Sequence, residues 1–202
     1  MSICIDKDTA TAVYKDEPLW VAGIDTSLTS TGVAIVDCVS GSSYSTTVCS
    51  KGTKNDTLKQ QCVRVTSMAD DIIDLVERAR PVRVVVESAL FSSRNDTSAH
   101  RRAGLWWLIT TTLISNGYEV CTLSPTELKK FATGKGNAGK DAMVAHAVDT
   151  WGLPDKVTKL NDEADALFLA TAGAWSLGFK VCLNHTAYRE DIADRLVKQL
   201  GS

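Results

Sequence analysis

Residues 21–36 read VAGIDTSLTSTGVAIV, with two apolar runs on either side of a hydroxyl-rich segment. The apolar run Val21–Ile24 predicts a short buried strand that ends in the acid Asp25. The hydroxyl-rich segment TSLTST is typical of a turn, and Gly32 closes it. A second apolar run, Val33–Val36, follows directly. The stretch therefore predicts two strands joined by a turn, with a carboxylate at the end of the first strand.

The rest of the chain alternates between the periods of strands and helices. Three further strands are predicted by β-prone runs at 44–49, 82–86 and 118–123. Apolar residues recur every three or four positions from Leu58 to Val76, including Cys62, which predicts an amphipathic helix that Pro81 ends. Further helices are predicted at 97–115, after the N-cap Ser124, and at 140–151, 162–177 and 188–200. This order favours a mixed α/β fold, one twisted sheet with helices on both faces.

The composition fits a globular protein with an uneven distribution of charge. The 202 residues are 44% apolar, which is enough to build a core. The net charge of −2 counts against a nucleic-acid binder, but residues 91–140 contain seven Lys and Arg and only three acids. That segment is +4 and the remainder −6, so a positive face can exist on an acidic molecule.

Targeting and cysteine patterns favour an intracellular protein. No stretch approaches the roughly 18 uninterrupted apolar residues of a membrane span. The first twenty residues lack the apolar run of a signal peptide. None of the six cysteines forms a CxxC pair, so we expect free thiols and no structural zinc site. We therefore expect a cytoplasmic protein without membrane contact.

Four acids stand where predicted elements begin or end. Asp25 ends the first strand and Glu87 the fourth, so parallel neighbours would bring them to about 5 Å from each other. Asp162 and Asp165 are three positions apart on a predicted helix and share a face, whereas Glu163 points elsewhere. Two like charges about 4 Å apart repel by about 4 kcal/mol at an effective dielectric near 20. A hard divalent cation, Mg²⁺ or Mn²⁺, removes that repulsion, and two such ions about 3.5–4 Å apart would clamp both reacting oxygens of a phosphodiester.

Each of these acids also has a simpler interpretation. An Asp after a strand is usually a turn former, as Asp25 could be, and Glu87 could be a solvated strand end. Asp162 is a candidate helix N-cap, where an acid favours the helix dipole. The metal hypothesis is favoured only because all of these positions belong to elements that one fold can bring together.

Four segments in this order resemble the RuvC family of Holliday junction resolvases: GIDTSLTSTGVAIV (23–36), VVVESALF (84–91), LSPTELKKFATGKGNAGKDAMV (123–144) and NDEADALFLA (161–170). The resemblance spans residues 21–178 and is that of a phage-encoded member. It implies an RNase H-like fold with a five-stranded mixed sheet, the third strand antiparallel at one edge, flanked by helices. It also implies an N-terminal extension at 1–19, a nuclease domain at 20–180 and a C-terminal helical extension at 181–202.

The resemblance assigns roles to individual residues. The catalytic acids, which would hold two Mg²⁺ ions or Mn²⁺ in their place, are Asp25, Glu87, Asp162 and Asp165. Lys129 and Lys140 match family lysines near the scissile phosphate, where a lysine neutralises developing charge; a solvated surface is the alternative. The family often has a base-stacking aromatic three residues after the strand-end Glu. Leu90 stands there and Phe91 follows, so Phe91 either stacks on DNA or belongs to the core.

Other residues near the second predicted helix are candidates for contacts with DNA or with a second subunit. Arg94, Arg101 and Arg102 could bind phosphates, which position DNA without reading its sequence; a solvated helix face is the alternative. Of the adjacent Trp106 and Trp107, we expect one in the core and the other at a dimer contact, because the family dimerises partly through this helix. Stacking of the second tryptophan on DNA is the less favoured alternative.

These expectations combine into one function with three alternatives. We expect a homodimer that cuts two like strands of a four-way DNA junction and leaves 5′-phosphate nicks. An RNase H-like nuclease for another branched DNA or RNA would carry the same acids. The phosphate loop of an actin-like ATPase or sugar kinase also reads as a strand, an Asp, a hydroxyl-rich turn and a Gly, much like GIDTSLTSTG, but that fold needs two such halves and we find one. GKGNAGK at 134–140 precedes Asp141 rather than the Ser or Thr of a P-loop, so we expect no nucleotide cofactor. A binding scaffold without cleavage would not benefit from acids beside phosphates.

Overall fold

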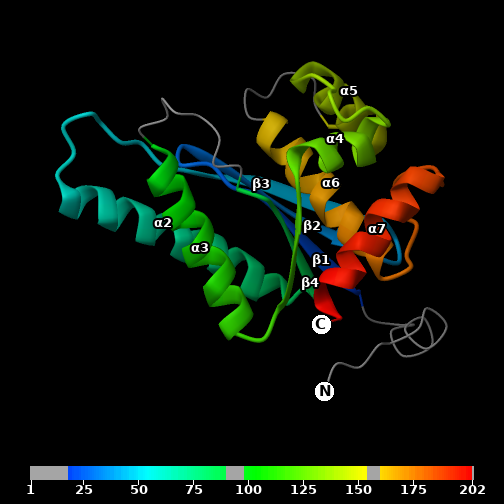
Figure 1. Cartoon of the computed structure of the whole chain (residues 1–202), viewed down its shortest axis with the longest axis horizontal. Coiled ribbons are helices and arrows are strands. Elements are labelled where there is room, and N and C mark those ends of the chain that lie inside the picture. The colour runs from blue at the N-terminus through cyan, green and yellow to red at the C-terminus, as the bar shows by residue number, and fades with distance from the viewer. Residues whose placement is uncertain (1–17, 90–97, 154–159, 202) are drawn as a thin grey trace.

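The computed structural model describes residues 18–89, 98–153 and 160–201 (Figure 1). The strands within these ranges are β1 (Trp20–Asp25), β2 (Ser30–Asp37), β3 (Ser43–Cys49), β4 (Arg83–Glu87) and β5 (Glu119–Leu123). The helices are α2 (Leu58–Ala79), α3 (Ala99–Ser115), α4 (Pro125–Thr133), α5 (Lys140–Trp151), α6 (Leu160–Ser176) and α7 (Ala187–Leu200). None of these helices combines the length and the apolarity that a membrane span requires.

The strands of the described ranges form one mixed sheet in the order β3-β2-β1-β4-β5. β1 pairs antiparallel with β2, and β2 pairs antiparallel with the edge strand β3. β4 and β5 continue the sheet on the other side of β1, and both run parallel to it. The predicted five-stranded mixed sheet with β3 at one edge is therefore confirmed, but the strand that runs opposite to the other four is β2 and not the third strand.

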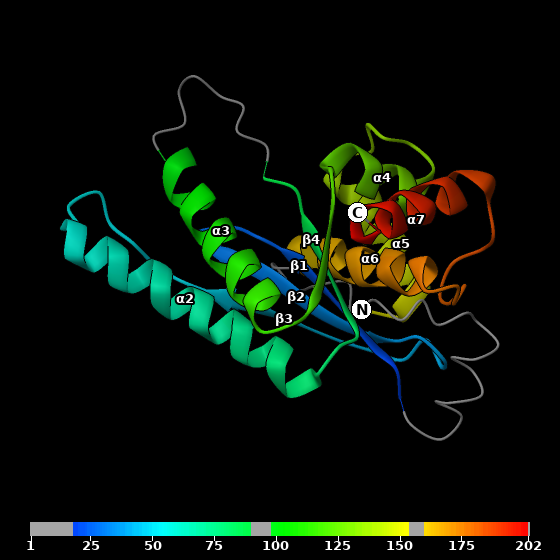
Figure 2. The ribbon, with the colours of Figure 1, turned by 60° about the horizontal axis from the view of Figure 1, so that its bottom comes forward.

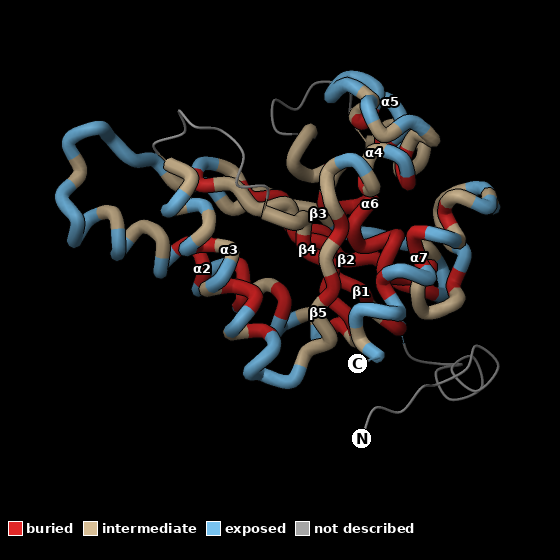
Figure 3. The backbone as a smooth tube through the Cα atoms, in the orientation of Figure 1, coloured by how far each residue is buried: buried red, intermediate tan, exposed pale blue. Residues whose placement is uncertain are grey.

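Helices cover both faces of this sheet. α2 and α3 lie side by side on one face, and α4, α5, α6 and α7 lie on the other (Figure 2). α6 is the central helix of the second layer, and its residues 166–175 are all buried (Figure 3). A helix that is apolar on all sides belongs in the interior of a protein, so α6 is held between the sheet and the outer helices.

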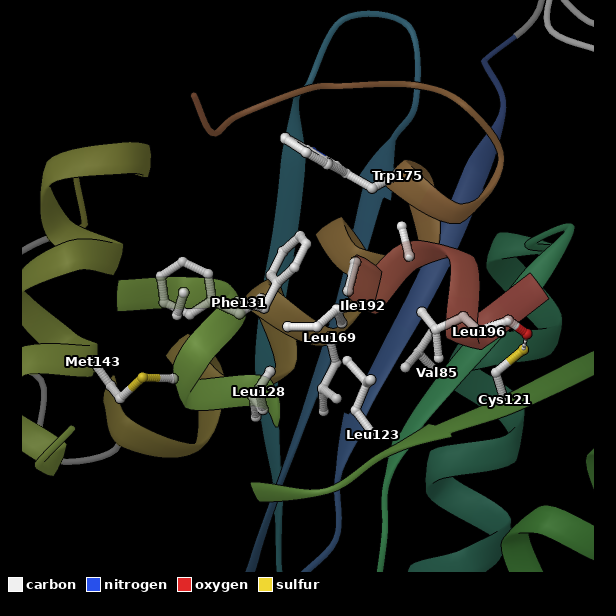
Figure 4. Packing of buried hydrophobic residues seen from close by; sticks show 14 of the residues in the cluster. Val85, Cys121, Leu123, Leu128, Phe131, Met143, Leu169, Trp175, Ile192 and Leu196 are labelled. Atoms are coloured by element: carbon white, nitrogen blue, oxygen red, sulfur yellow. Dashed lines mark hydrogen bonds between the residues drawn. The ribbon is translucent and has the colours of Figure 1, made fainter. Parts of the chain in front are cut away.

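The C-terminal helix shares the core of the helical layer around α6. Leu128 and Phe131 of α4, Leu169 of α6, and Ile192 and Leu196 of α7 belong to one buried cluster (Figure 4). The segment expected as a C-terminal extension therefore packs directly on the elements of the sheet domain.

The predicted buried face of α2 is wrong in its first turns. Leu58 is 76% exposed and Cys62 is exposed as well. The N-terminal half of α2 extends beyond the strands (Figure 1), so no sheet lies beneath these residues. The end of the helix agrees with the prediction, because Arg80 takes a left-handed conformation (φ 49°) directly before Pro81.

Candidate active site

Two carboxylates meet where β1 and β4 end. The parallel register pairs Ile24 with Val86, so Asp25 and Glu87 occupy corresponding positions one residue later. Ile24 and Val86 pack against α2 and α3. Because side chains alternate along a strand, Asp25 and Glu87 face the opposite side of the sheet, which α6 covers. Their carboxyl groups lie within hydrogen-bonding reach of each other.

Two glycines allow α6 to lie directly on the strands beside these acids. A Cβ on Gly32 would stand 1.9 Å from the carbonyl oxygen of Asp162, and a Cβ on Gly23 would stand 2.0 Å from another backbone oxygen of α6. Gly32 is also the register partner of Asp25. The first turn of α6 therefore contacts the sheet next to Asp25, and this contact brings Asp162 and Asp165 to the strand-end carboxylates.

Burial and mutual repulsion raise the pKa values of these acids. Burial is the main cause that raises the pKa of Asp25 well above its ordinary value, and the charges of Glu87 and Asp162 add to the rise. Burial also raises the pKa of Glu87, with a further contribution from the charge of Asp165. Burial and the charges of Asp25 and Asp162 raise the pKa of Asp165 to about 7. Without a cation, the site therefore retains protons near neutral pH.

This set of oxygens suits a hard divalent cation. Asp165 Oδ1 is buried and has no hydrogen-bond partner among the described residues, an arrangement that is unfavourable unless a further partner binds. Carboxylate oxygens are the ligands that Mg²⁺ and Mn²⁺ prefer. In residues 18–89, 98–153 and 160–201, no three His, Cys, Asp or Glu side chains are placed so that they could hold an ion without moving. The acids thus supply suitable ligands, which a bound cation would draw together.

Two lysines face the acidic group. Lys129 of α4 opposes the rise in the pKa of both Glu87 and Asp165. Lys140, the first residue of α5, has the same effect on Asp25 and Asp165. The structure therefore brings both family-matched lysines to the acids, where an ammonium group can neutralise charge on a phosphate.

The helix that carries Lys129 is short and has well-defined ends. The Ser124 hydroxyl accepts from the backbone N–H of Glu127 at 3.3 Å, and the Glu127 carboxylate accepts from the backbone N–H of Ser124 at 3.0 Å. Pro125 stands at the first helical position, where its missing N–H is not needed. Gly134 ends the helix in the left-handed conformation, with φ 81°. The N-cap at Ser124 is the one that the sequence predicts, whereas the C-cap at Gly134 was not assigned from the sequence.

Comparison with known proteins agrees with this geometry. The family model of the crossover junction endodeoxyribonuclease RuvC matches residues 21–172. The chain belongs to the RuvC family. A RuvC from Clavibacter michiganensis is 29% identical over 158 residues, 78% of this chain and 77% of that protein. A RuvC from Paenarthrobacter aurescens is 31% identical over 163 residues, 79% of this chain and 83% of that protein. These relatives are bacterial, and the expected phage origin stays a prediction.

Solved structures of the RuvC family share the fold. Thermus thermophilus RuvC in complex with a Holliday junction substrate has a TM-score of 0.62 and 24% identity, and the match covers 80% of this chain and 97% of that one. Thermus thermophilus RuvC alone has a TM-score of 0.59 and 23% identity, with 80% and 98% covered. The predicted α/β, RNase H-like fold is therefore confirmed.

One residue that supports this RuvC-family site was not assigned from the sequence. The indole Nε1 of Trp106 donates to the carbonyl oxygen of Glu87 at 2.8 Å. Trp106 packs against the core between the sheet and α3, whereas Trp107 is 56% exposed. Of the two tryptophans, Trp106 is thus partly buried at the edge of the core, and Trp107 is exposed. The bond to Glu87 depends on the placement of α3, for which residue spacing gives no signal.

A small cavity adjoins Glu87 in this RuvC-family protein. Its volume is about 220 Å³, and it is lined by Thr26, Glu87, Ser88, Ala89, Ala99, Arg102 and Pro125. Arg102 thus lies within reach of the acidic site. Arg101 instead faces α2, where its Nη1 donates to Gln61 Oε1 at 3.3 Å. Phe91 and Arg94 lie outside the described residues.

Proposed function

We propose that this RuvC-family protein resolves four-way DNA junctions by metal-dependent hydrolysis of phosphodiester bonds and leaves nicks with 5′ phosphates. One observation carries the proposal: acids from β1, β4 and α6 converge at one point beside two lysines. The names of the relatives, crossover junction endodeoxyribonuclease, support the choice of substrate.

The metal ligands in this proposal are Asp25, Glu87, Asp162 and Asp165. Four ionised carboxylates carry a charge that two divalent ions would balance, so we infer two Mg²⁺ ions in each site, with Mn²⁺ able to replace them. When bound, the ions supply an activated water and neutralise charge on the leaving oxygen.

Basic side chains of the protein would orient the DNA around these acids. Lys129 beside Glu87, and Lys140 beside Asp25, would neutralise charge on the scissile phosphate. Arg102 at the cavity would bind a neighbouring phosphate. The remaining candidates for DNA contacts stay predictions: Phe91, Arg94 and Arg101.

We also infer that two copies assemble through α3. Exposed positions recur every three or four residues along one face of this helix, at Gly104, Trp107, Thr111 and Ile114. Trp107 and Ile114 are 56% and 58% exposed, so this face carries two large apolar side chains in contact with solvent. Apart from its chain neighbours and the backbone of α3 itself, no described atom lies within 4 Å of the position that a Cβ on Gly104 would occupy, so a second helix can approach closely. A two-fold dimer would present two like sites to the two like strands of a junction.

Cleavage of a synthetic four-way junction tests the proposal. With Mg²⁺, the wild type should produce paired, symmetric nicks with 5′ phosphates, and a chelator should abolish them. Glu87→Gln should lower the single-turnover rate by at least about 10²-fold. Glu163→Gln is the matched control, because Glu163 lies beside Asp162 but accepts from the Ser45 hydroxyl at 2.7 Å. Absence of paired nicks, or a Glu87→Gln rate equal to that of the wild type, would contradict the proposal.

The same assay on other substrates distinguishes junction resolution from the alternative of a nuclease for other branched DNA or RNA. Flapped DNA and RNA–DNA hybrids of the same sequence should be cut much more slowly than the junction. Faster cleavage of either would replace the junction as the proposed substrate while retaining the acids as the catalytic site.

A further inference from the structure

Helix α7 lies after the segment that matches the RuvC family, residues 21–172, yet it contacts the helix that carries Lys129. Ile192 and Leu196 of α7 share a buried cluster with Leu128 and Phe131 of α4 (Figure 4). This apolar contact fixes the distance between the two helices. The polar contacts around it determine how α4 is oriented.

Arg189 links α7 to the last turn of α4. Its side chain is buried, its Nε donates to the Phe131 carbonyl oxygen at 2.7 Å, and its Nη2 donates to the Ala132 carbonyl oxygen at 2.9 Å. Nη1 donates to the Asn184 carbonyl oxygen at 2.6 Å, which holds the guanidinium itself in place. The last carbonyls of a helix lack partners within that helix, and a positive charge is favourable there. Arg189 therefore fixes the C-terminal end of α4.

α7 also contacts β5 and the first turn of α4. Arg195 Nη1 lies 3.1 Å from Glu127 Oε1, the carboxylate that closes the capping box. The Gln199 side chain accepts from the backbone N–H of Thr122 at 2.8 Å and donates to the Thr122 carbonyl oxygen at 2.9 Å. Because β5 is an edge strand, Gln199 satisfies backbone groups that have no neighbouring strand. α7 thus contacts β5 and both ends of α4.

Lys129 is the active-site group on the segment held in this way. It lies near Glu87 and Asp165 and belongs to α4. Lys140 instead lies near Asp25 and Asp165 and belongs to α5. The contacts of Arg189, Arg195 and Gln199 are with α4, β5 or the segment before α7. A displacement of α7 should therefore affect Lys129 more than Lys140.

We propose that α7 is a brace that positions Lys129, with Arg189 as the positioning residue, and that Arg195 and Gln199 complete the brace. The proposal rests on the function proposed above. Arg189→Lys is the informative change, because an ammonium group keeps the charge but cannot reproduce the planar fork that binds two carbonyl oxygens.

Double-variant kinetics on a four-way junction test the brace. Arg189→Lys should lower the single-turnover rate roughly tenfold, because a misplaced catalytic group slows the reaction even when the substrate still binds. The affinity for the junction should change little. In a Lys129→Ala background, Arg189→Lys should cause no further loss, whereas in a Lys140→Ala background the roughly tenfold loss should persist. Equal losses in both backgrounds, or no loss in the wild type, would overturn the proposal.

Hydrogen exchange gives a second readout that does not depend on cleavage. Arg189→Lys should speed amide exchange in residues 130–134 at the end of α4 and leave α6 unchanged. Gln199→Ala is the second variant, should Arg189→Lys fail to fold, and exposed Lys198 provides the control Lys198→Ala. Gln199→Ala should speed exchange in β5 and α4, and unchanged exchange there would overturn the brace. A wild type that cuts no junction would refute the proposed function alone, because the exchange measurement tests the brace separately.

Discussion

At the residue scale, the acids of the site differ from ordinary strand-end carboxylates in their surroundings. Asp25 and Glu87 face each other, and Asp162 and Asp165 face them from α6. Asp165 is the most informative of the four, because its pKa rises to about 7 and its Oδ1 has no partner among the described residues. In the folded protein without metal, ionisation of the Asp165 carboxyl is therefore unfavourable, and unfolding removes this cost.

This environment predicts how the stability of the metal-free protein depends on pH. The folded pKa of Asp165, about 7, lies above its ordinary value of 3.8, so unfolding releases a proton between these two pH values. Stability should therefore fall as the pH rises from 4 to 7, and the loss is complete above pH 7. Asp165→Asn should remove this loss and raise the melting temperature at pH 7.5 by about 3 °C or more. Equal melting temperatures of the metal-free wild type and Asp165→Asn at pH 7.5 would contradict a raised pKa of Asp165.

Trp106 should act on the reaction through the backbone of Glu87. Trp106→Phe keeps an aromatic ring but removes the donor to the Glu87 carbonyl oxygen. We expect a loss of about 1–2 kcal/mol in stability and a lower single-turnover cleavage rate with nearly unchanged junction affinity. Measured rates and affinities for both proteins check this. A variant with reduced affinity and an unchanged rate would instead assign Trp106 to DNA binding.

The sequence predicted the acids but not the groups that hold them. Asp25 and Glu87 end strands that the sequence predicts, and the spacing of Asp162 and Asp165 places them on one helical face. Trp106 was not predicted as a partner of Glu87, because that bond depends on how α3 lies against the sheet. Interactions between elements distant in sequence leave no periodic pattern, so they had to be found in the structure.

At the scale of elements, the contact between α6 and the sheet determines the site. At Gly32 and Gly23 the backbone of α6 lies so close to the strands that a Cβ would overlap with its carbonyl oxygens. Without these glycines the helix would have to move outward, and its acids would move away from Asp25.

Gly32→Ala tests this contact. The new Cβ would stand 1.9 Å from the carbonyl oxygen of Asp162, so α6 or β2 must shift. We expect a loss of about 3 kcal/mol in the free energy of unfolding and a large loss of cleavage in the fraction that remains folded. Gly201→Ala is the matched control for stability, because the nearest atom, the carbonyl oxygen of Val197, would lie 3.9 Å from the new Cβ. Equal denaturation midpoints for the two variants would show that α6 does not require Gly32.

The order of the elements was readable from the sequence, whereas the environment of each surface was not. The N-cap at Ser124 predicted where α4 begins, because capping residues act locally. The exposure of Leu58 was not predicted, since periodicity identifies an apolar face but not whether another layer covers it. The close approach of α6 at Gly32 was likewise invisible, because in the sequence this glycine looked only like the end of a turn.

At the scale of the whole molecule, α3 lies across the sheet from the layer formed by α4, α5, α6 and α7 (Figure 2). A dimer formed through α3 would therefore leave α4 and its lysine free to meet DNA. It would also place Trp106, which binds the Glu87 carbonyl oxygen, next to the interface residue Trp107.

Trp107→Glu should disrupt this dimer. The substitution removes a large apolar contact and would place a charge at the centre of the interface. Aromatic residues at the centre of an interface often contribute more than about 2 kcal/mol to association. Sedimentation velocity should show a dimer for the wild type and a monomer for Trp107→Glu. The matched control is Val197→Glu on α7, where Val197 is 40% exposed. A monomeric wild type, or a dimer that Trp107→Glu leaves intact, would exclude α3 as the interface.

Calorimetric titration of Mn²⁺ into the DNA-free protein at pH 7 tests most directly whether the four acids form one metal site. The wild type should bind Mn²⁺ and release protons, since the pKa of Asp165 is about 7. Glu163→Gln should bind equally well, and Asp165→Asn should bind at least about tenfold more weakly. Mn²⁺ binding that is equally strong in the wild type and in Asp165→Asn, or absent from the wild type, would contradict a shared metal site.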